Sequence, residues 1–458
     1  MTLAWLDMAS EKLNRLKIEN AKIVLIARDC RKSSEEVPQA VIRAVQVRGY
    51  QPVYVSRDIP SCAASYAWAI RAVRPVLAIF LTASHVRGED VMGAKVSILG
   101  SSGELESLTT QEIKETSYSQ LLNILTDRNV RQEDILFNPE YPDINENYMD
   151  MAVLVGLVGS GVIKDKTLYD LAKEFEEAQD IQKVIDNYRE YFIHQPLLGL
   201  RVVIEAAHTP SGRLAKGVFE KLGADVITLH EEIRELSGQH RADPSVIDNL
   251  TDLFKEVAIG RHMGIAFDLD GDRGAIVIPK EDEFVILSPD ILTQVLLPFF
   301  NQRGYSVEQR GKVAIVRCVL STKAVDAGGK QLNYEVYPTD AGYVFLKAKV
   351  RELKEKGYTV PIYAERSGHA WTHLTGAFED PIVVSLFFAI IGKEHMEEKQ
   401  DTSRYALYNA FISKVIPYQQ STRFQPLFAE EFLKELSESK ENDTGWNIAS
   451  GQRPPMQI

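Results

Sequence analysis

The residues with the clearest chemical pattern are three aspartates spaced two apart. Asp268, Asp270 and Asp272 stand in the run Asp-Leu-Asp-Gly-Asp-Arg, between two apolar stretches typical of strands. Carboxylates at this spacing can converge on one hard divalent cation when the backbone curls around it. Because three such groups repel one another unless a cation neutralises them, the pattern favours metal binding over its alternative, an acidic surface turn. We expect Mg²⁺ if a phosphate supplies further oxygen ligands.

A calcium-binding EF-hand is the obvious competing interpretation of alternating aspartates. It requires Gly at the sixth position of its loop and Glu at the twelfth. Arg273 and Pro279 stand at these positions, and the flanking stretches are not helical in pattern. The sequence therefore predicts a metal loop between two strands.

A second group of reactive side chains follows another apolar run. Ser84 and His85 come directly after the stretch 76–81, and Lys95 follows across a loop that contains glycine. Ligands of open α/β sheets collect beyond the carboxyl ends of strands, so Ser84 stands where a nucleophile with proton-transfer partners would be useful. The alternative is an ordinary turn. No G-x-S-x-G elbow surrounds Ser84, which argues against an α/β-hydrolase.

A third group follows the apolar run PIYA. Glu365, Ser367 and His369 stand close together in the chain. A carboxylate beside a hydroxyl suits hydrogen bonding to the hydroxyls of a sugar, and the alternative is a strand-to-helix turn.

The elements that must position these groups alternate between strand and helix patterns. This alternation predicts βαβ units and sheets with parallel pairs. Predicted strands cover 21–27, 52–56, 76–81, 201–206, 225–229, 313–316 and 360–363, and predicted helices cover 34–48, 210–222, 290–300 and a long segment from 380. We therefore expect an α/β protein with three tandem units, and a linker with helices over 138–195.

Length and charge limit the classes of function. A chain of 458 residues has room for about three domains. Its net charge of −12 repels phosphate backbones, which argues against a nucleic-acid partner. Cys30, Cys62 and Cys318 have no C-x-x-C spacing and exclude a disulfide framework or a cysteine zinc site.

The apolar stretches are short. The longest, 151–163 and 382–391, fall below the length of a membrane span, and the first residues lack the pattern of a signal peptide. We expect a cytoplasmic protein without a membrane partner, and the sequence leaves the oligomeric state open.

Taken in order, the three groups resemble the motifs of the α-D-phosphohexomutase family, in its phosphomannomutase/phosphoglucomutase branch. That family carries a T-A-S-H-N-P phosphoserine loop, a D-G-D-G-D-R metal loop and a G-E-x-S-G-H sugar loop on three related α/β domains around a central cleft. This chain has TASHVR, DLDGDR and AERSGH. Weaker similarities are RDCR at 28–31, IVRC at 315–318 and TDAGYVFLK at 339–347.

The resemblance implies a division of the chain and a set of roles. The phosphoserine domain would cover 1–137, the linker 138–195, the metal domain 196–279, the sugar domain 280–398, and a remnant of a fourth domain with a disordered tail 399–458. Ser84 would be phosphorylated, and an oxygen of its phosphate would complete a Mg²⁺ site on Asp268, Asp270 and Asp272.

The remaining roles also follow from the resemblance. Arg273 would neutralise charge on the transferring phosphoryl group, and His85 and Lys95 would assist proton transfer. Sugar hydroxyls would bind Glu365 and Ser367. Further substrate contacts would come from Arg317, His369, Arg28 and Arg31.

The chain departs from the family pattern in several places. Val86 and Arg87 replace Asn-Pro, the loop to Lys95 is one residue longer, and Leu269 replaces a glycine. The family's G-T-x-G-x-R-G segment and the R-x-S-G-T-E-P phosphate loop of its fourth domain are not found in the sequence. We therefore expect a truncated or missing fourth domain and a weakened activity.

The resemblance implies a Mg²⁺-dependent phosphohexomutase. Its substrates would be hexose 1-phosphates and 6-phosphates of glucose, mannose or both, which would interconvert through a phosphoserine and a hexose bisphosphate. Two alternatives stay open: a non-catalytic relative that binds sugar phosphates, and a metal-dependent phosphatase that acts through Ser84.

Overall fold

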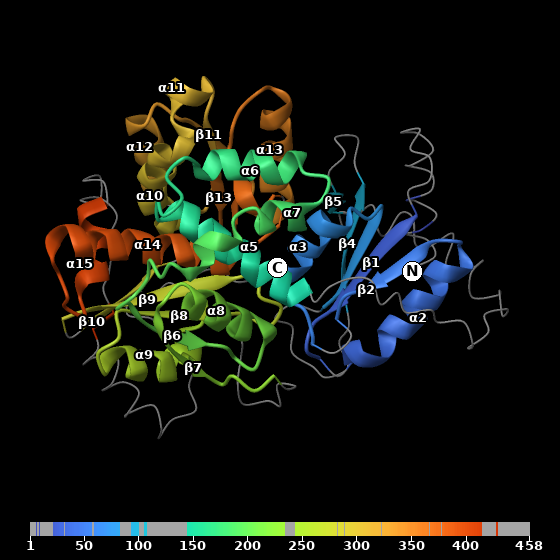
Figure 1. The fold of residues 1–458 in the computed structure, drawn as a ribbon, viewed down its shortest axis with the longest axis horizontal. Coiled ribbons are helices and arrows are strands. Elements are labelled where there is room, and N and C mark those ends of the chain that lie inside the picture. Colours follow the sequence, from blue (N-terminus) through green and yellow to red (C-terminus); the bar gives the residue numbers. More distant parts are fainter. Residues whose placement is uncertain are drawn as a thin grey trace.

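The protein is an α/β structure in which helices flank three sheets (Figure 1). The computed structural model describes residues 6, 9, 22–31, 33–56, 59–82, 93–99, 105–107, 144–233, 243–281, 283–287, 289–321, 323–365, 367–376, 378–414 and 427–428. Ser84 and His85 lie outside the described residues, as do Val86 and Arg87. Most of 399–458, the expected remnant of a fourth domain, also lies outside them.

The first sheet places the end of a fully buried strand beside the site. Its strand order is β2-β1-β3-β4-β5, with β1 parallel to both of its neighbours and β4 antiparallel to β3. A parallel strand covered on both faces has a continuous apolar sequence, as LAIFL has in β3. The elements are β1 (Ile23–Arg28), α2 (Ser33–Val47), β2 (Gln51–Tyr54), α3 (Ala63–Val73), β3 (Leu77–Leu81), β4 (Ala94–Leu99) and β5 (Leu105–Ser107).

The second sheet carries the aspartate loop. Its order is β15-β10-β9-β8-β6-β7, and β8 pairs with β9 in an antiparallel hairpin. The predicted loop between two strands is therefore confirmed. β10, which follows the expected domain limit at residue 279, also joins this sheet. The elements are β6 (Arg201–Glu205), α8 (Pro210–Lys221), β7 (Asp225–Leu229), η2 (Ile247–Leu250), α9 (Thr251–Ala258), β8 (Met263–Phe267), β9 (Gly274–Lys280), β10 (Glu283–Leu287) and β15 (Leu427–Phe428).

The third sheet carries the Glu365–His369 loop. Its order is β12-β11-β13-β14, with β11 parallel to β12 and β13 and with β14 antiparallel to β13. Its strands are β11 (Ala314–Cys318), β12 (Glu335–Thr339), β13 (Ile362–Ala364) and β14 (Ala370–Thr372). Its helices are α10 (Pro289–Phe300), η3 (Asn301–Tyr305), α11 (Val307–Arg310), α12 (Ala324–Gln331), α13 (Tyr343–Glu355), η4 (His373–Thr375), α14 (Pro381–Lys399) and α15 (Ala406–Lys414).

Two buried helices join the three units into one core. α5 (Ile144–Gly159) and α14 are apolar around most of their circumference, which is the pattern of a helix surrounded by protein. They pack closely, because a Cβ atom on Gly156 would lie only 3.2 Å from Leu386 of α14. Figure 1 shows both helices in the middle of the molecule, between the lobes of the second and third sheets.

Helix α5 begins early in the segment 138–195, for which we expect a linker with helices. Residues 144–147 are helical despite the Pro- and Asn-rich composition of 138–147. The helix extends to Ile144 because that side chain is buried, and the nearby Tyr148 hydroxyl donates to Asp380 Oδ1 at 2.9 Å. Asp380 in turn caps the first turn of α14.

The connection between α5 and the second sheet is helical, as expected. It consists of α6 (Leu168–Glu177), α7 (Ile181–Asp186) and η1 (Arg189–Ile193). Among the described helices, none combines the length and the apolar character that crossing a bilayer requires.

Removal of one aromatic ring tests this shared core. Phe387 of α14 is fully buried, with its ring centroid 5.4 Å from that of Phe299 and 5.3 Å from that of Phe300. We expect Phe387→Ala to lower the free energy of unfolding by about 3–5 kcal/mol, because it leaves a cavity. Ile259→Ala, at a side chain that is 78% exposed, should change it by less than about 0.5 kcal/mol. Urea denaturation measures both, and equal shifts would contradict the central position of α14.

Candidate functional site

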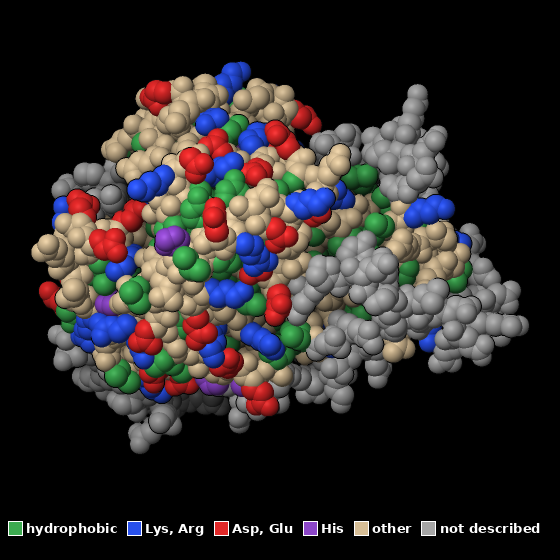
Figure 2. Space-filling model, in the orientation of Figure 1, with side chains coloured by type: hydrophobic (Ala, Val, Ile, Leu, Met, Phe, Trp, Pro, Cys, Tyr) green, Lys and Arg blue, Asp and Glu red, His purple; other side chains and the backbone are tan. Residues whose placement is uncertain are grey.

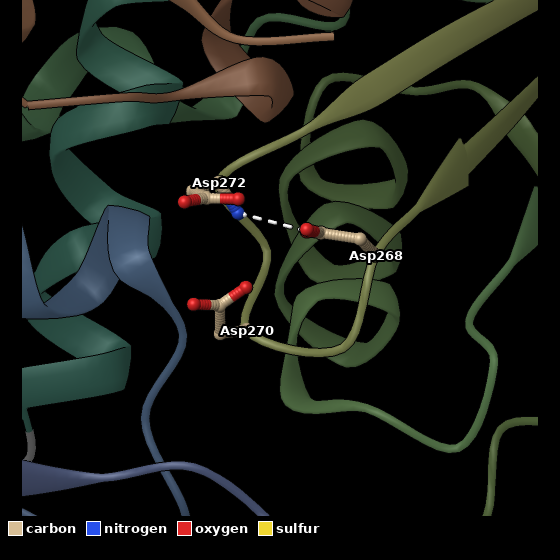
Figure 3. A group of neighbouring side chains, drawn as sticks. All are labelled: Asp268, Asp270 and Asp272. Atoms are coloured by element: carbon tan, nitrogen blue, oxygen red, sulfur yellow. Dashed lines mark hydrogen bonds between the residues drawn. The ribbon is translucent and has the colours of Figure 1, made fainter. Parts of the chain in front are cut away.

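The three aspartates of the β8–β9 loop form a buried cluster (Figure 3). One ligand oxygen from each carboxylate lies within 4.8 Å of the other two. Asp268 organises the loop, because its Oδ1 atom accepts the backbone N–H of Asp272 at 3.0 Å and that of Arg273 at 3.1 Å. Gly271 has φ +70°, and a Cβ there would lie 2.0 Å from Ser211 Oγ, so the turn requires glycine.

Three carboxylate oxygens of the cluster lack hydrogen-bond partners among the described residues, as is typical of a cation site. Asp268 Oδ2, Asp270 Oδ1 and Asp272 Oδ1 are buried and accept no hydrogen bond from any described residue. Burial and the two neighbouring carboxylates raise the pKa of Asp268 well above its ordinary value. Oxygen ligands of this kind are those that hard divalent cations bind, so these residues fit a metal such as Mg²⁺.

Lys95 reaches the cluster from the first sheet. Its Nζ atom donates to Asp270 Oδ2 at 2.8 Å and also contacts Asp272 Oδ2. Thr82 Oγ1 donates to the same Asp270 oxygen at 3.1 Å. Thr82 and Lys95 stand on either side of the segment that contains Ser84 and His85, and the Thr82 N–H is bonded to Gly93 O at 3.2 Å. The chain therefore enters and leaves that segment beside the aspartates.

The third-sheet loop meets the cluster from another side. His369 Nε2 lies 3.4 Å from Asp272 Oδ2, and the Gly274 N–H donates to Gly368 O at 3.1 Å. Burial disfavours a charged imidazole, but Asp272 raises the pKa of His369 to about 9. In the same way, Lys95 and His369 outweigh burial and hold the pKa of Asp272 well below its ordinary value.

The other two predicted sugar ligands lie beside His369. Ser367 Oγ donates to Glu365 Oε2 at 2.8 Å and lies 3.0 Å from His369 Nδ1. Glu365 Oε1 is buried and has no hydrogen-bond partner among the described residues. This carboxylate therefore offers an acceptor to a ligand hydroxyl.

Helix N-termini surround the loop as well. The Ala63 N–H at the start of α3 donates to Asp270 O at 2.7 Å. Ser211, in the first turn of α8, lies against Gly271, and Pro381, at the start of α14, lies against Gly274. Because helix N-termini carry partial positive charge, they offset part of the repulsion among the carboxylates.

Arg273 and Leu269 complete the loop. Arg273 Nε lies 3.8 Å from Asp268 Oδ2, and its backbone forms an isolated bridge with His369. Leu269, which stands where the family pattern has glycine, is buried against Cys30 and Ala207. The Leu269 side chain is therefore accommodated among apolar side chains.

Three predicted arginines have other partners. Arg317 Nη2 bonds Asp326 Oδ2 at 2.8 Å, although its backbone pairs with Ala364, the residue before Glu365. Arg28 Nε donates to Tyr54 Oη at 3.0 Å. Arg31 Nε donates to Asp29 Oδ2 at 3.2 Å. Their roles in substrate binding stay predictions.

Sequence reasoning missed a buried ion pair close to the cluster. Lys347 Nζ lies 3.3 Å from Glu379 Oε1, and it stands 5.6 Å from the centroid of the Trp371 ring. Burial lowers the pKa of Lys347. Lys347 is the last residue of the segment 339–347, whose similarity to the family pattern is the one sequence signal for this pair.

Two separate stretches of the chain match models of known protein domains. Residues 3–120 match the model of phosphoglucomutase/phosphomannomutase alpha/beta/alpha domain I, and residues 182–281 match that of domain II. A phosphoglucosamine mutase of Campylobacter hominis is 28% identical over 272 residues, which are 57% of this chain and 55% of the relative. A phosphomannomutase/phosphoglucomutase of Pseudomonas syringae pv. tomato is 28% identical over 173 residues, or 37% of this chain and 34% of the relative. The chain thus matches about half the length, or less, of these two curated relatives.

Solved structures share the fold. A phosphoglucomutase/phosphomannomutase family protein from Burkholderia thailandensis has a TM-score of 0.62 at 19% identity, covering 89% of this chain and 76% of that one. The phosphoglucomutase pp63/parafusin from Paramecium, in its open form, has a TM-score of 0.60 at 16% identity, covering 92% and 71%. These structures show the fold alone, and it is the match of residues 3–120 and 182–281 to domains I and II that supports membership of the chain in the α-D-phosphohexomutase family.

Proposed function

We propose that the protein is a Mg²⁺-dependent phosphohexomutase that interconverts hexose 1-phosphate and hexose 6-phosphate, with glucose, mannose or both as the sugar. One observation carries the proposal. Two residues on either side of the Ser84 segment, Thr82 and Lys95, contact the buried carboxylates of the aspartate loop. His369 of the predicted sugar loop lies beside the same carboxylates. The proposed nucleophile segment, metal loop and sugar-binding loop would thus share one centre.

The charges around this centre suit phosphoryl transfer. That reaction depends mainly on positioning and on positive charge near the phosphoryl oxygens. Mg²⁺ held by Asp268, Asp270 and Asp272 would supply such charge. Lys95 and His369 add positive charge from the first and third sheets, and both already contact Asp272.

In the first proposed transfer, a sugar hydroxyl oxygen forms a bond to the phosphorus on Ser84 and passes its proton to a base. The bond between phosphorus and Ser84 Oγ breaks, and Ser84 Oγ takes up a proton from an acid. The bisphosphate then reorients. In the second transfer, Ser84 Oγ gives its proton to the base and bonds the other phosphorus, while the sugar O–P bond breaks and the sugar oxygen takes up a proton. His85 and Lys95 are the proposed proton-transfer groups. Glu365 and Ser367 hold the sugar hydroxyls in both steps.

Replacement of the nucleophile tests the reaction. We expect Ser84→Ala to lose phosphate from the intact mass of the protein and to lower kcat/KM by about 10³-fold or more, because no acceptor remains for the phosphoryl group. Conversion of glucose 1-phosphate and mannose 1-phosphate to the 6-phosphates measures the rate.

Ser403→Ala, at an exposed serine, is the control and should behave as the wild type. Equal rates in the two variants would end the proposal. Release of inorganic phosphate without an isomer would indicate a phosphatase, and sugar-phosphate binding without turnover would indicate a non-catalytic relative.

Replacement of one carboxylate tests the metal site. We expect Asp270→Asn to raise the Kd for Mg²⁺ at least about tenfold, because a charged ligand is lost. The increase in melting temperature on addition of Mg²⁺ should shrink accordingly, since that increase reflects binding to the folded state. Asp248→Asn, at an exposed aspartate, should leave both unchanged. Similar Mg²⁺ affinities in the two variants would contradict the site.

The sugar loop can be tested separately from the metal loop. Glu365→Gln keeps the shape of the side chain but removes the charged acceptor. We expect kcat/KM for hexose phosphates to fall by about 10- to 100-fold, the size of one or two charge-assisted hydrogen bonds. The Kd for Mg²⁺, measured by calorimetry, should stay unchanged. An unchanged kcat/KM, or a weaker Mg²⁺ affinity, would contradict the assignment of Glu365 to the sugar.

A further inference from the structure

A cavity of about 760 Å³ lies where the first sheet's helix α3 meets the connecting helix α6 and the third unit's α13 and η4. Its described lining includes no residue of the aspartate loop and none of the Glu365–His369 loop. Pockets of roughly 300–1,000 Å³ at domain boundaries are typical small-molecule sites. The cavity therefore has the size and the location of a second ligand site.

Helix α3 separates this cavity from the aspartates. It begins at Ala63, whose N–H bonds Asp270, and its other end supplies Ile70, Arg71 and Arg74 to the cavity wall. A helix of 11 residues is about 16 Å long, so the cavity and the metal loop lie at opposite ends of one rigid element.

The described wall is positively charged in a protein that is acidic as a whole. Figure 2 shows acidic and basic side chains interspersed on the visible face, and the net charge of the chain is −12. Around the cavity, five basic side chains stand against two acidic ones. The basic residues are Arg71, Arg74, Lys173, Arg351 and Lys354, and the acidic ones are Glu176 and Glu355.

One carboxylate, that of Glu176, contacts several side chains of the cavity wall. Glu176 is bonded by Lys173 Nζ at 2.8 Å and by His373 Nε2 at 2.9 Å, and Lys354 Nζ lies 3.6 Å away. Burial lowers the pKa of His373. The charge of Glu176 is thus shared between two lysines, and basic side chains outnumber acidic ones in the described lining.

The cavity is held open by fixed contacts. Tyr305 Oη lies 3.1 Å from His373 Nδ1, which completes a chain of hydrogen bonds from Tyr305 through His373 to Glu176. Arg71 donates to Leu374 O and Arg74 to Ala178 O, which ties the end of α3 to η4 and to the end of α6. A ligand would therefore meet a largely preformed site.

Aromatic side chains supply the apolar part of the lining. Tyr358 and Phe378 lie on the side of the third unit, and Tyr169 and Phe175 on that of α6. We propose that the cavity binds a small organic phosphate with a ring-shaped body, whose phosphate groups contact Arg351 and Lys354 and whose ring packs on Tyr358 and Phe378. This proposal does not depend on the proposed mutase activity.

Calorimetry with three probes tests the chemistry of the site. Adenosine 5′-diphosphate carries charge and rings, pyrophosphate carries charge alone, and adenosine carries rings alone. EDTA in the buffer removes divalent cations, so that the aspartate loop has no metal to hold a phosphate. We expect saturable binding of one adenosine 5′-diphosphate per chain, weaker binding of pyrophosphate, and the weakest of adenosine. Absence of saturable binding by all three would overturn the proposal.

Two double variants, each of which removes two positive charges, test whether the ligand binds in this cavity. Arg351→Gln with Lys354→Gln removes two cations of the lining, and we expect the Kd for adenosine 5′-diphosphate to rise at least about tenfold, since each charge-assisted hydrogen bond contributes a factor of this size or more. Lys349→Gln with Lys356→Gln, on the same helix and at its C-cap but outside the described lining, should leave the Kd unchanged. Equal weakening of binding in both double variants would indicate a diffuse electrostatic effect and overturn the proposal. The proposal would also be overturned if Asp270→Asn abolished binding while both cavity substitutions left it unchanged.

Discussion

Mutual repulsion among three buried carboxylates is the physical constraint that the other residues of this site compensate. Asp268, Asp270 and Asp272 place ligand oxygens within 4.8 Å of one another, away from water. Like charges in such a position destabilise the fold unless cations lie close to them. Lys95 and His369 provide part of that charge, and the unpaired oxygens leave room for a divalent ion.

The compensating charges come from distant parts of the chain, and this links the electrostatics to the architecture. Lys95 stands on the first sheet, the aspartates on the second and His369 beside the third. These sheets keep their relative positions because α5 and α14 pack against one another in a continuous apolar core. The proposed reaction would need such an arrangement, since a phosphoryl donor, a metal and a sugar would have to stay aligned through two transfers.

The same architecture produces the second cavity. Helix α3 contacts the aspartate loop at one end and the basic cavity at the other. Helix α13 likewise carries Lys347, close to the aspartates, and then Arg351 and Lys354 at the cavity. Both places therefore lie at boundaries between units, which is where small-molecule sites tend to form.

Local spacing in the sequence determined much of this protein. The two-residue spacing of the aspartates between apolar runs predicts the β8–β9 loop, and Glu365, Ser367 and His369 do lie together, because these signals act within a few residues. The order of the three motifs along the chain predicts the family. Only the tertiary structure decided that Lys95 reaches Asp270 across a longer loop, that Arg317 pairs with Asp326, and that Lys347 pairs with Glu379. Such contacts depend on how separately folded elements pack. Lys95 and Asp270, for example, are separated by 175 positions in the chain. No local pattern in the chain encodes that packing.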